Sequence, residues 1–395
     1  MAFLGPADAP NSLIPQLRSI VGRRHVLSGA ARTAAYTTGY RSGGGPVAAV
    51  VRPGSLVELW RVFKACVAAD HIVIVQAANT GLTGGSTPLG EYDRPVVLIS
   101  TLRIKGVIPI DQGRQVICLA GATLYELERA LAPWDREPHS VIGSSCLGAS
   151  VIGGVCNNSG GALVQRGPSY TEYALFAQVD ETGEVRLCNR LGVDLGNEPE
   201  AMLAKLEQRL FLDRDILADG RTASAAADYA DVVRAVDEPS PARFNADPRR
   251  LFDASGSAGK VLVLAARLDT FARPARDAVF YIGTNDTGEL TELRRHILSQ
   301  AATLPVSGEY IHREAFDIAA RYGKDTVLAI RLLGTDRLPI LFRLKGWVDR
   351  LAKAVRFLPR QPSDRLLQSC SSLLPQHLPP RMRAFRDNYE HHLIL

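Results

Sequence analysis

Residues 76–87, with the sequence QAANTGLTGGST, decide the fold. This stretch contains no charged residue, and it follows an apolar segment, residues 72–75, that predicts a buried strand. Small residues let a backbone approach a ligand closely, and successive N–H groups without partners form a concave site for an anion. The stretch therefore predicts a loop that binds phosphate or pyrophosphate. When the loop is taken alone, a glycine-rich surface turn is an equally good interpretation.

A second uncharged segment strengthens the ligand-binding interpretation. Residues 139–165 form a glycine-rich run of 27 residues without Lys, Arg, Asp or Glu. Such segments are rarely exposed, yet glycines cannot supply a hydrophobic core. An extended cofactor between the two segments would fill the space, with its pyrophosphate at backbone N–H groups and its rings on apolar surface. The GxGxxG and Walker spacings are absent, which argues against a nicotinamide enzyme or a P-loop NTPase.

The residues around these segments predict an α+β fold. Strand, helix, strand, loop and strand follow one another in the first hundred residues, an order that favours an α/β or α+β unit. Turn sequences between later apolar runs predict hairpins. The expected helices are 12–21 (capped by Asn11 or Ser12), 56–69 (capped by Ser55), 124–131 (capped by Thr123) and 289–299, and the expected strands are 47–51, 72–75, 96–99, 107–110, 115–119, 174–179, 185–188, 261–268 and 279–282.

Length and composition describe an ordinary folded chain. The 395 residues suffice for two or three domains, and 46% hydrophobic with 22% charged residues exclude a disordered or fibrous chain. Residues 213–256 are poor in large apolar side chains and predict an excursion over the surface. The six cysteines stand singly, so we expect reduced structural thiols in a cytosolic chain. No export signal or run of about 20 apolar residues is found, so we expect neither export nor a membrane span.

Positive charge is concentrated towards the C-terminal end. Lys and Arg total 46 against 41 Asp and Glu, a net charge of +5 that is too small to predict nucleic-acid binding. Residues 311–390 contain 15 basic and 8 acidic residues, a net of +7, so the remainder carries −2. Within them, residues 340–358 predict an amphipathic helix. Phe342, Trp347 and Phe357 widen its apolar side, which favours an interfacial helix on anionic lipid over packing on a core.

Four motifs together resemble one protein family. They are residues 77–87, Arg136-Glu137-Pro138-His139-Ser140, residues 143–161 and Gln165-Arg166-Gly167-Pro168. They resemble the FAD-linked oxidases with the p-cresol methylhydroxylase type of flavin domain, and among these the respiratory, quinone-dependent D-lactate dehydrogenases. The resemblance extends from about residue 34 to Glu390-His391-His392, and it is far more specific than either glycine-rich segment.

The resemblance implies a non-covalently bound FAD between two α+β subdomains. It implies oxidation of D-lactate to pyruvate, with electrons passed to a membrane quinone, by a peripheral protein at the cytoplasmic face of the bacterial inner membrane. The reaction requires a hydride acceptor, a base for the hydroxyl proton and a cation for the carboxylate, and the sequence does not assign the last two. No metal is implied, and the FAD-binding residues that it implies are Ala77, Ala78, Asn79, Thr80, Gly81, Gly85, Ser86, Gly143, Ser150, Gly160 and Val263.

The same resemblance divides the chain into four parts. Residues 1–268 would form the FAD-binding domain, with its core at about 35–190, and residues 269–311 the start of a cap domain. Residues 312–388 would form an electropositive membrane-binding region. Residues 389–395 would return into the cap as a strand that ends at Leu395 without partners. We expect such an open cap to retain FAD weakly and to support little quinone reduction. An inactive or weakly active fragment and a flavin-independent peripheral membrane protein are the alternatives.

The conspicuous histidines have structural alternatives. We expect His139 to be a hydrogen-bonded structural residue rather than a base or a flavin attachment point. His312 and Arg313 can bind a carboxylate, but an exposed pair in the first turn of a helix is the favoured interpretation. His391 and His392 carry little weight as catalytic residues, because they lie at the end of the chain.

Overall fold

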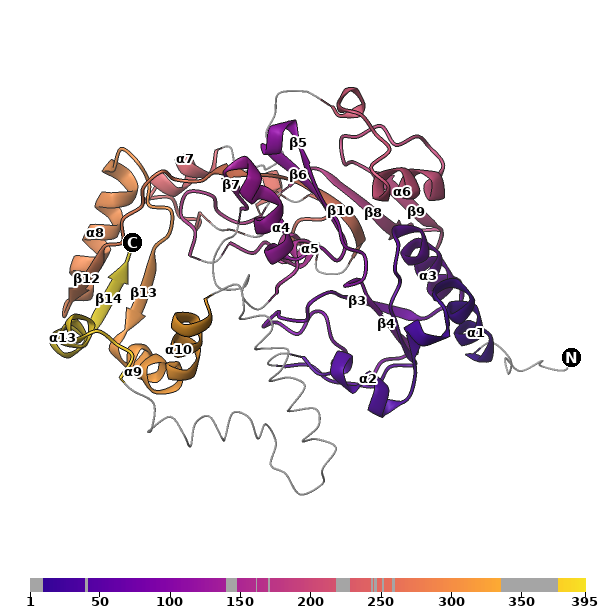
Figure 1. Ribbon diagram of the computed structural model, residues 1–395, viewed down its shortest axis with the longest axis horizontal. Helices are drawn as coiled ribbons and strands as arrows, with labels where there is room; N and C mark the ends of the chain where they lie inside the picture. Colours follow the sequence, from indigo (N-terminus) through magenta and orange to yellow (C-terminus); the bar gives the residue numbers. More distant parts are fainter. Residues whose placement is uncertain are drawn as a thin grey trace, which may run out of the picture. The chain divides into compact units, whose positions relative to one another are not determined.

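The computed structural model describes residues 10–39, 42–139, 148–160, 162–169, 171–217, 228–242, 244, 247–250, 252–257, 260–334 and 376–395. The chain divides into two compact units, whose elements are labelled in Figure 1. The first unit comprises Met1–Gly161, Pro168–Asp228 and Arg243–Arg273, and the second comprises Ala162–Gly167, Tyr229–Ala242 and Pro274–Leu395.

A four-stranded sheet begins the first unit. Its strand order is β1 (Val26–Leu27), β2 (Ala49–Val51), β4 (Val96–Ser100) and β3 (Ile72–Gln76). Strands β2 and β3 run parallel to β4, whereas β1 runs antiparallel to β2. The helices here are α1 (Pro10–Val21), α2 (Ala30–Thr37) and α3 (Leu56–Ala68). The predicted cap of α3 is confirmed, because Ser55 Oγ accepts a hydrogen bond from the Glu58 N–H at 3.1 Å.

A five-stranded antiparallel sheet follows in the same unit. Its order is β5 (Val107–Ile110), β6 (Gln115–Leu119), β10 (Leu262–Asp269), β8 (Ala174–Val179) and β9 (Val185–Asn189). The predicted hairpin is confirmed, because β5 and β6 pair across the turn Asp111–Gly113. The other elements are α4 (Leu124–Leu131), β7 (Arg136–Glu137), α5 (Val151–Cys156), α6 (Pro199–Glu207) and β11 (Phe271–Ala272). Thr123 caps α4 in a capping box with Glu126, as the sequence predicts.

The hydrophobic core of the first unit has two parts. One cluster joins α1 and α3 to both sheets, with Val51 and Ile99 from the first sheet and Ile117 and Leu264 from the second. The other lies on the opposite face of the five-stranded sheet and includes Val263 with residues of α4 and α5. The second sheet is therefore buried on both faces. This arrangement of mixed helices and sheets confirms the expected α+β class.

The second unit contains a three-stranded antiparallel sheet. Its order is β12 (Tyr281–Thr284), β14 (His391–Ile394) and β13 (Glu309–His312), so the last strand lies in the centre. The expectation that this strand lacks partners is wrong, because all four of its residues pair on both sides. The expectation of an open cap depended on unpaired residues in this strand, so the reason for it no longer holds. The helices are α7 (Tyr229–Arg234), α8 (Thr287–Gln300), α9 (Arg313–Tyr322), α10 (Lys324–Leu333) and α13 (Pro380–Asn388).

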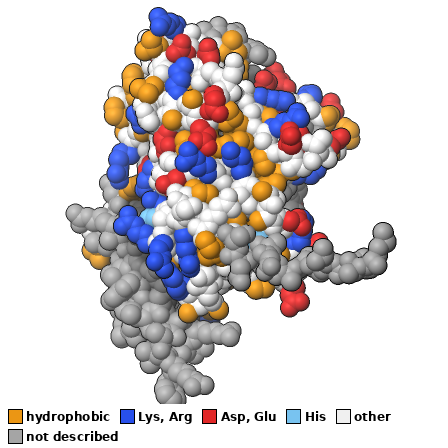
Figure 2. Space-filling view, turned by 90° about the vertical axis from the view of Figure 1, so that its right-hand side faces the viewer, with side chains coloured by type: hydrophobic (Ala, Val, Ile, Leu, Met, Phe, Trp, Pro, Cys, Tyr) orange, Lys and Arg blue, Asp and Glu red, His pale blue; other side chains and the backbone are white. Residues whose placement is uncertain are grey.

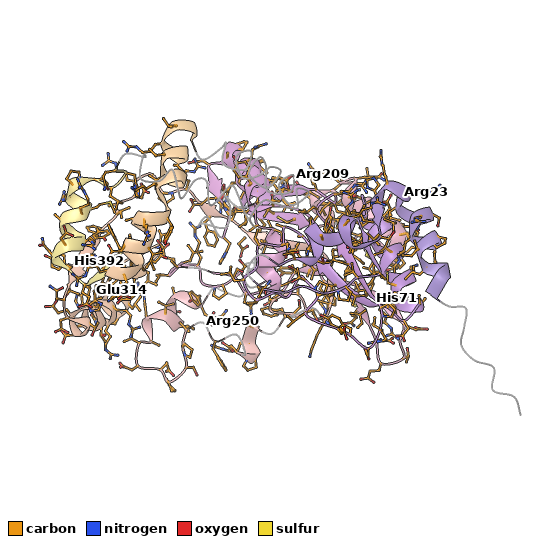
Figure 3. All side chains as sticks on the ribbon, turned by 90° about the horizontal axis from the view of Figure 1, so that it is seen from below. Arg23, His71, Arg209, Arg250, Glu314 and His392 are labelled. Atoms are coloured by element: carbon orange, nitrogen blue, oxygen red, sulfur yellow. The ribbon has the colours of Figure 1, made fainter. Side chains whose placement is uncertain are left out.

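Two other expectations differ from the structure. The first helix begins at Pro10, before the predicted caps Asn11 and Ser12. The segment 213–256 is not a surface excursion throughout, because Tyr229, Arg250 and Ala254 are buried. Arg250, labelled in Figure 3, forms an ion pair with Asp228, which allows a charged side chain to be buried where apolar residues are few. The predicted amphipathic helix at 340–358 lies outside the described residues.

The two sheets of the first unit approach each other closely at one glycine. Gly121 follows β6, and a Cβ atom at this position would lie 2.1 Å from the carbonyl oxygen of Thr101, which follows β4. The Gly121 N–H also donates to the Ile104 carbonyl at 2.9 Å. Because the obstructing atom belongs to the backbone, it cannot turn away as a side chain would. The close contact between the sheets therefore requires glycine.

We expect Gly121→Ala to destabilise the first unit by about 3 kcal/mol, because the added methyl group forces the sheets apart. Gly44→Ala is the matched control, since the nearest atom to its new Cβ, the Thr37 carbonyl oxygen, lies at an ordinary 3.7 Å. Urea denaturation of both flavin-free variants measures the difference. Equal stability of the two variants would contradict the assignment.

Candidate functional site

The loop between β3 and β4 is held by polar side chains of its own. Asn79 adopts a left-handed backbone conformation with φ at 54°. Its side-chain nitrogen donates to the Thr38 carbonyl at 2.9 Å, and its side-chain oxygen accepts a hydrogen bond from Ser86 Oγ at 3.0 Å. These bonds tie the middle of the loop to its end and to the chain that follows α2. The loop is therefore shaped before any ligand is present.

The backbone N–H groups of this loop are available to a ligand. Within the part of the chain that the structure describes, those of residues 78–86 donate no hydrogen bond. A Cβ atom at Gly81 would meet no atom within 4 Å, and one at Gly85 would meet only Thr83 Oγ1, at 4.0 Å. A row of free donors beside open space and without a charged side chain fits a pyrophosphate. Ala77, Ala78, Thr80, Gly81 and Gly85 lie in or next to this row of N–H groups, and their contact with FAD stays a prediction.

The second segment is described from Gly148 to Gly160. Ser150 caps α5, and its Oγ accepts a hydrogen bond from the Gly153 N–H at 3.1 Å. Gly160 is buried. Val263 is 4% exposed and packs in one cluster with Val151 and Val155, at a point where the pairing of β10 with β8 shifts register. Gly143, a predicted flavin contact, lies outside the described residues.

A short series of hydrogen bonds connects the two segments. The Gln76 carbonyl accepts from the Thr101 N–H at 2.9 Å, and Thr101 Oγ1 donates to the Ala120 carbonyl at 3.0 Å. Two residues further on, the Ala122 carbonyl accepts from the Val151 N–H at 2.9 Å. The loop after β3 and the start of α5 are thus linked through the ends of β4 and β6. The loop and the described residues 148–160 thus belong to one unit.

His139, Cys66 and Cys118 are buried ionisable side chains of the first unit. His139 is 6% exposed, and its Nδ1 lies 3.0 Å from Ser169 Oγ, so the expected hydrogen bonding of this histidine is confirmed. Burial raises the pKa of the Cys66 and Cys118 thiols to about 12, which keeps both neutral and unreactive. The described residues contain no group of three or more His, Cys, Asp or Glu that can hold a metal ion.

The second unit carries a polar cluster on its sheet. His312 caps α9, because its Nδ1 accepts from the Glu314 N–H at 3.2 Å. Its other ring nitrogen must then carry a hydrogen, and it lies 3.2 Å from Glu390 Oε1. Arg313 approaches the same carboxylate less closely, at 3.9 Å. His312 and Arg313 are thus a partly exposed pair at the start of a helix, as expected.

His391 and His392 occupy opposite faces of the central strand. His391 Nδ1 lies 2.8 Å from the Tyr310 hydroxyl, beside His312. His392 is fully buried between Tyr281 and Phe316, and its ring nitrogens form no hydrogen bond of good geometry with the described residues. Figure 3 shows it in the second unit. Burial lowers its pKa, an effect that a backbone contact at Tyr389 partly offsets. Adjacent residues of a strand point to opposite sides of the sheet, which gives the two rings these different surroundings.

Comparison with known proteins agrees with this geometry. Residues 47–189 match the family model of an FAD binding domain, and residues 279–395 match the model described as D-lactate dehydrogenase, membrane binding. An alkyldihydroxyacetonephosphate synthase structure superimposes with a TM-score of 0.52 at 14% identity, over 95% of this chain and 68% of that one. For a p-cresol methylhydroxylase structure the score is 0.48 at 14% identity, over 72% and 47%. The first unit therefore has the α+β fold of an FAD binding domain.

Curated relatives narrow this class. Quinone-dependent D-lactate dehydrogenase of Escherichia coli is 56% identical over 385 residues, which is 97% of this chain and 67% of the relative. That of Corynebacterium glutamicum is 47% identical over 383 residues, with shares of 97% and 67%. The chain belongs to the quinone-dependent D-lactate dehydrogenase family, and its cofactor is FAD.

Replacement of Gly81 separates flavin binding from folding. We expect Gly81→Leu to abolish most FAD binding, because its side chain occupies the space beside the free N–H groups, while the flavin-free protein melts as the parent does. Gly81→Ala, which adds one methyl group, is expected to have a smaller effect. Flavin per protein after gel filtration measures the loss. A Gly81→Leu protein that retains the parent's FAD would place the pyrophosphate elsewhere.

Buried His392 predicts acid sensitivity of the second unit. Its pKa is lower in the folded than in the unfolded chain, so the unfolded chain binds more protons below about pH 6.5, and stability falls as the pH drops below that value. His392→Phe removes this dependence, which amounts to about 1.4 kcal/mol if the ring's pKa is lowered by one. Hydrogen exchange of peptides covering β14, at about pH 7.5 and 5.5, measures it. The same acid sensitivity in both proteins would exclude His392 as its source.

Proposed function

We propose that this chain oxidises D-lactate to pyruvate with non-covalently bound FAD and passes the electrons to a membrane quinone. The observation that carries the proposal is the row of free N–H groups at residues 78–86 in a member of this family. Non-covalent binding is supported by His139, which is buried and engaged with Ser169. The residues assigned to FAD are Ala77, Ala78, Asn79, Thr80, Gly81, Gly85, Ser86, Gly143, Ser150, Gly160 and Val263.

The substrate carboxylate requires a cation that the flavin loops do not provide. FAD, when bound, accepts the hydride from the substrate. The loop at 77–87 and the described residues 148–160 contain no charged side chain. Arg313 is 37% exposed, and it engages Glu390 only loosely, at 3.9 Å. A guanidinium group in this state can form paired hydrogen bonds with another carboxylate, so Arg313 is the cation that we test for the carboxylate of D-lactate.

Flavin reduction tests the reaction and this residue together. D-lactate added without oxygen should bleach the visible flavin absorbance of the parent, whereas L-lactate should not. Arg313→Met should require roughly thirtyfold more D-lactate, since a hydrogen bond to a charged group contributes about 2 kcal/mol. Arg313→Lys, which keeps the charge, should fall between them. Absence of flavin from the purified protein would favour a flavin-independent membrane protein, and an unchanged requirement in Arg313→Met would assign the cation elsewhere.

The second unit is assigned to the membrane as a peripheral partner. In the part of the chain that the structure describes, no helix is both long and apolar enough to cross a bilayer. The face in Figure 2 belongs to the first unit, on the side that carries α1 and α3, and basic and acidic side chains are interspersed there. Eight of the fifteen basic residues of the segment 311–390 lie in residues 335–375, outside the described ones. We assign residues 1–268 to an FAD-binding domain, and residues 269–311 and 389–395 to a cap domain. Residues 312–388 are assigned to the binding of anionic lipid at the cytoplasmic face of a bacterial inner membrane.

Vesicle flotation tests the role of charge. The protein should float with vesicles that contain anionic lipid and much less with neutral vesicles, because each Lys or Arg near an anionic surface contributes about 1 kcal/mol. Added salt should weaken the association, and detergent should complete the release. Equal flotation with both kinds of vesicle would remove the electrostatic part of the assignment.

A further inference from the structure

A buried glutamine stands at the base of the flavin loop. Gln76 is the last residue of β3 and is only 2% exposed. Its side-chain nitrogen donates two hydrogen bonds of 2.8 Å each, one to the Tyr36 carbonyl and one to the Ser86 carbonyl. Because both partners are carbonyl oxygens, the nitrogen and not the oxygen of the amide must face them. The donors of the amide are therefore fully used.

These two bonds join segments that are far apart in the sequence. Ser86 is the end of the loop whose start follows Gln76, so one bond closes the loop across its neck. Tyr36 lies in the last turn of α2, where carbonyl groups lack partners within the helix, so the other bond satisfies one of them. Asn79 reaches the same region through the Thr38 carbonyl. The loop is thus fastened to the end of α2 at its neck and in its middle.

The strand itself does not depend on this side chain. Strand β3 pairs with β4 over five residues, and the backbone carbonyl of Gln76 accepts from the Thr101 N–H. The side chain therefore adds only the connection between the loop neck and α2. Fixing a binding loop in advance lowers the entropy lost when the ligand binds.

We propose that Gln76 is a positioning residue for FAD, which fixes the loop so that its free N–H groups converge on the pyrophosphate. The inference rests on the proposed FAD function and adds a residue that does not itself touch the cofactor. A neutral donor suits this place, because a carboxylate would face two carbonyl oxygens and repel the anionic ligand, while an apolar side chain would leave both carbonyls without a partner.

Two variants of nearly equal size test the role. Gln76→Met keeps the length of the side chain but has no donor, and it should raise the Kd for FAD at least tenfold at temperatures where the flavin-free variant is still fully folded. Gln178→Met, a partly buried glutamine of β8, is the matched control and should keep the parent's Kd. Inorganic pyrophosphate, used as a competitor of FAD binding, should lose affinity in the same variant, because the effect is at the phosphates.

Gln76→Glu adds a readout that a purely structural role would not move. Its carboxylate cannot donate, but its protonated form can donate one hydrogen bond. The Kd for FAD relative to the parent should therefore improve as the pH is lowered from about 8 to about 5.5, whereas the ratio for Gln76→Met should stay constant. If Gln76→Met does not fold, this pH dependence alone decides whether Gln76 positions the loop for FAD.

Different results would overturn the proposed function and the positioning role of Gln76. A parent protein that binds no FAD overturns the proposed function. A parent that binds FAD, with an unchanged Kd in Gln76→Met or no pH recovery in Gln76→Glu, overturns only the positioning role.

Discussion

A loop whose backbone N–H groups stay free for a ligand tolerates almost no side chain nearby, and residues 78–86 of the first unit meet that constraint. The loop after β3 and the segment that leads to α5 both consist mainly of small, uncharged residues. Neither can contribute much to a hydrophobic core. The stability of the unit therefore comes from the two clusters on either side of the five-stranded sheet, which keep the ends of β4 and β6 in place.

Local patterns predicted the elements near this site well. The caps at Ser55 and Thr123 and the hairpin between β5 and β6 depend on neighbouring residues, so their signals are complete in short stretches. The position of β10 between β6 and β8 depends on distant partners, since Ala265 pairs with Leu119 and Leu262 with Ala177, and no local pattern contains it. Gln76 and Gly121 were missed for the same reason, because their roles appear only through contacts with distant carbonyl groups.

In the second unit, the sequence gives little indication of where two residues lie. A pair of histidines in the last residues has little value as a motif, yet the structure places them in the middle of a sheet with contrasting environments. His391 has a tyrosine hydroxyl as a partner, whereas His392 is enclosed by aromatic rings. The apolar residues that follow, Leu393 and Ile394, predict a strand, and alternation along it separates the two rings. The partner strands could not be identified without the fold.

The central place of β14 also dictates an order of assembly. Strands β12 and β13 do not pair with each other, and the 78 residues 313–390 separate the end of β13 from the strand that lies between them in the sheet. During synthesis, the first unit can complete its sheet once β10 has left the ribosome, whereas the sheet of the second unit must wait for residues 391–394. Closing so long a loop costs chain entropy and slows folding. A newly made chain therefore passes through a stage with one finished unit and two strands whose common partner has still to arrive.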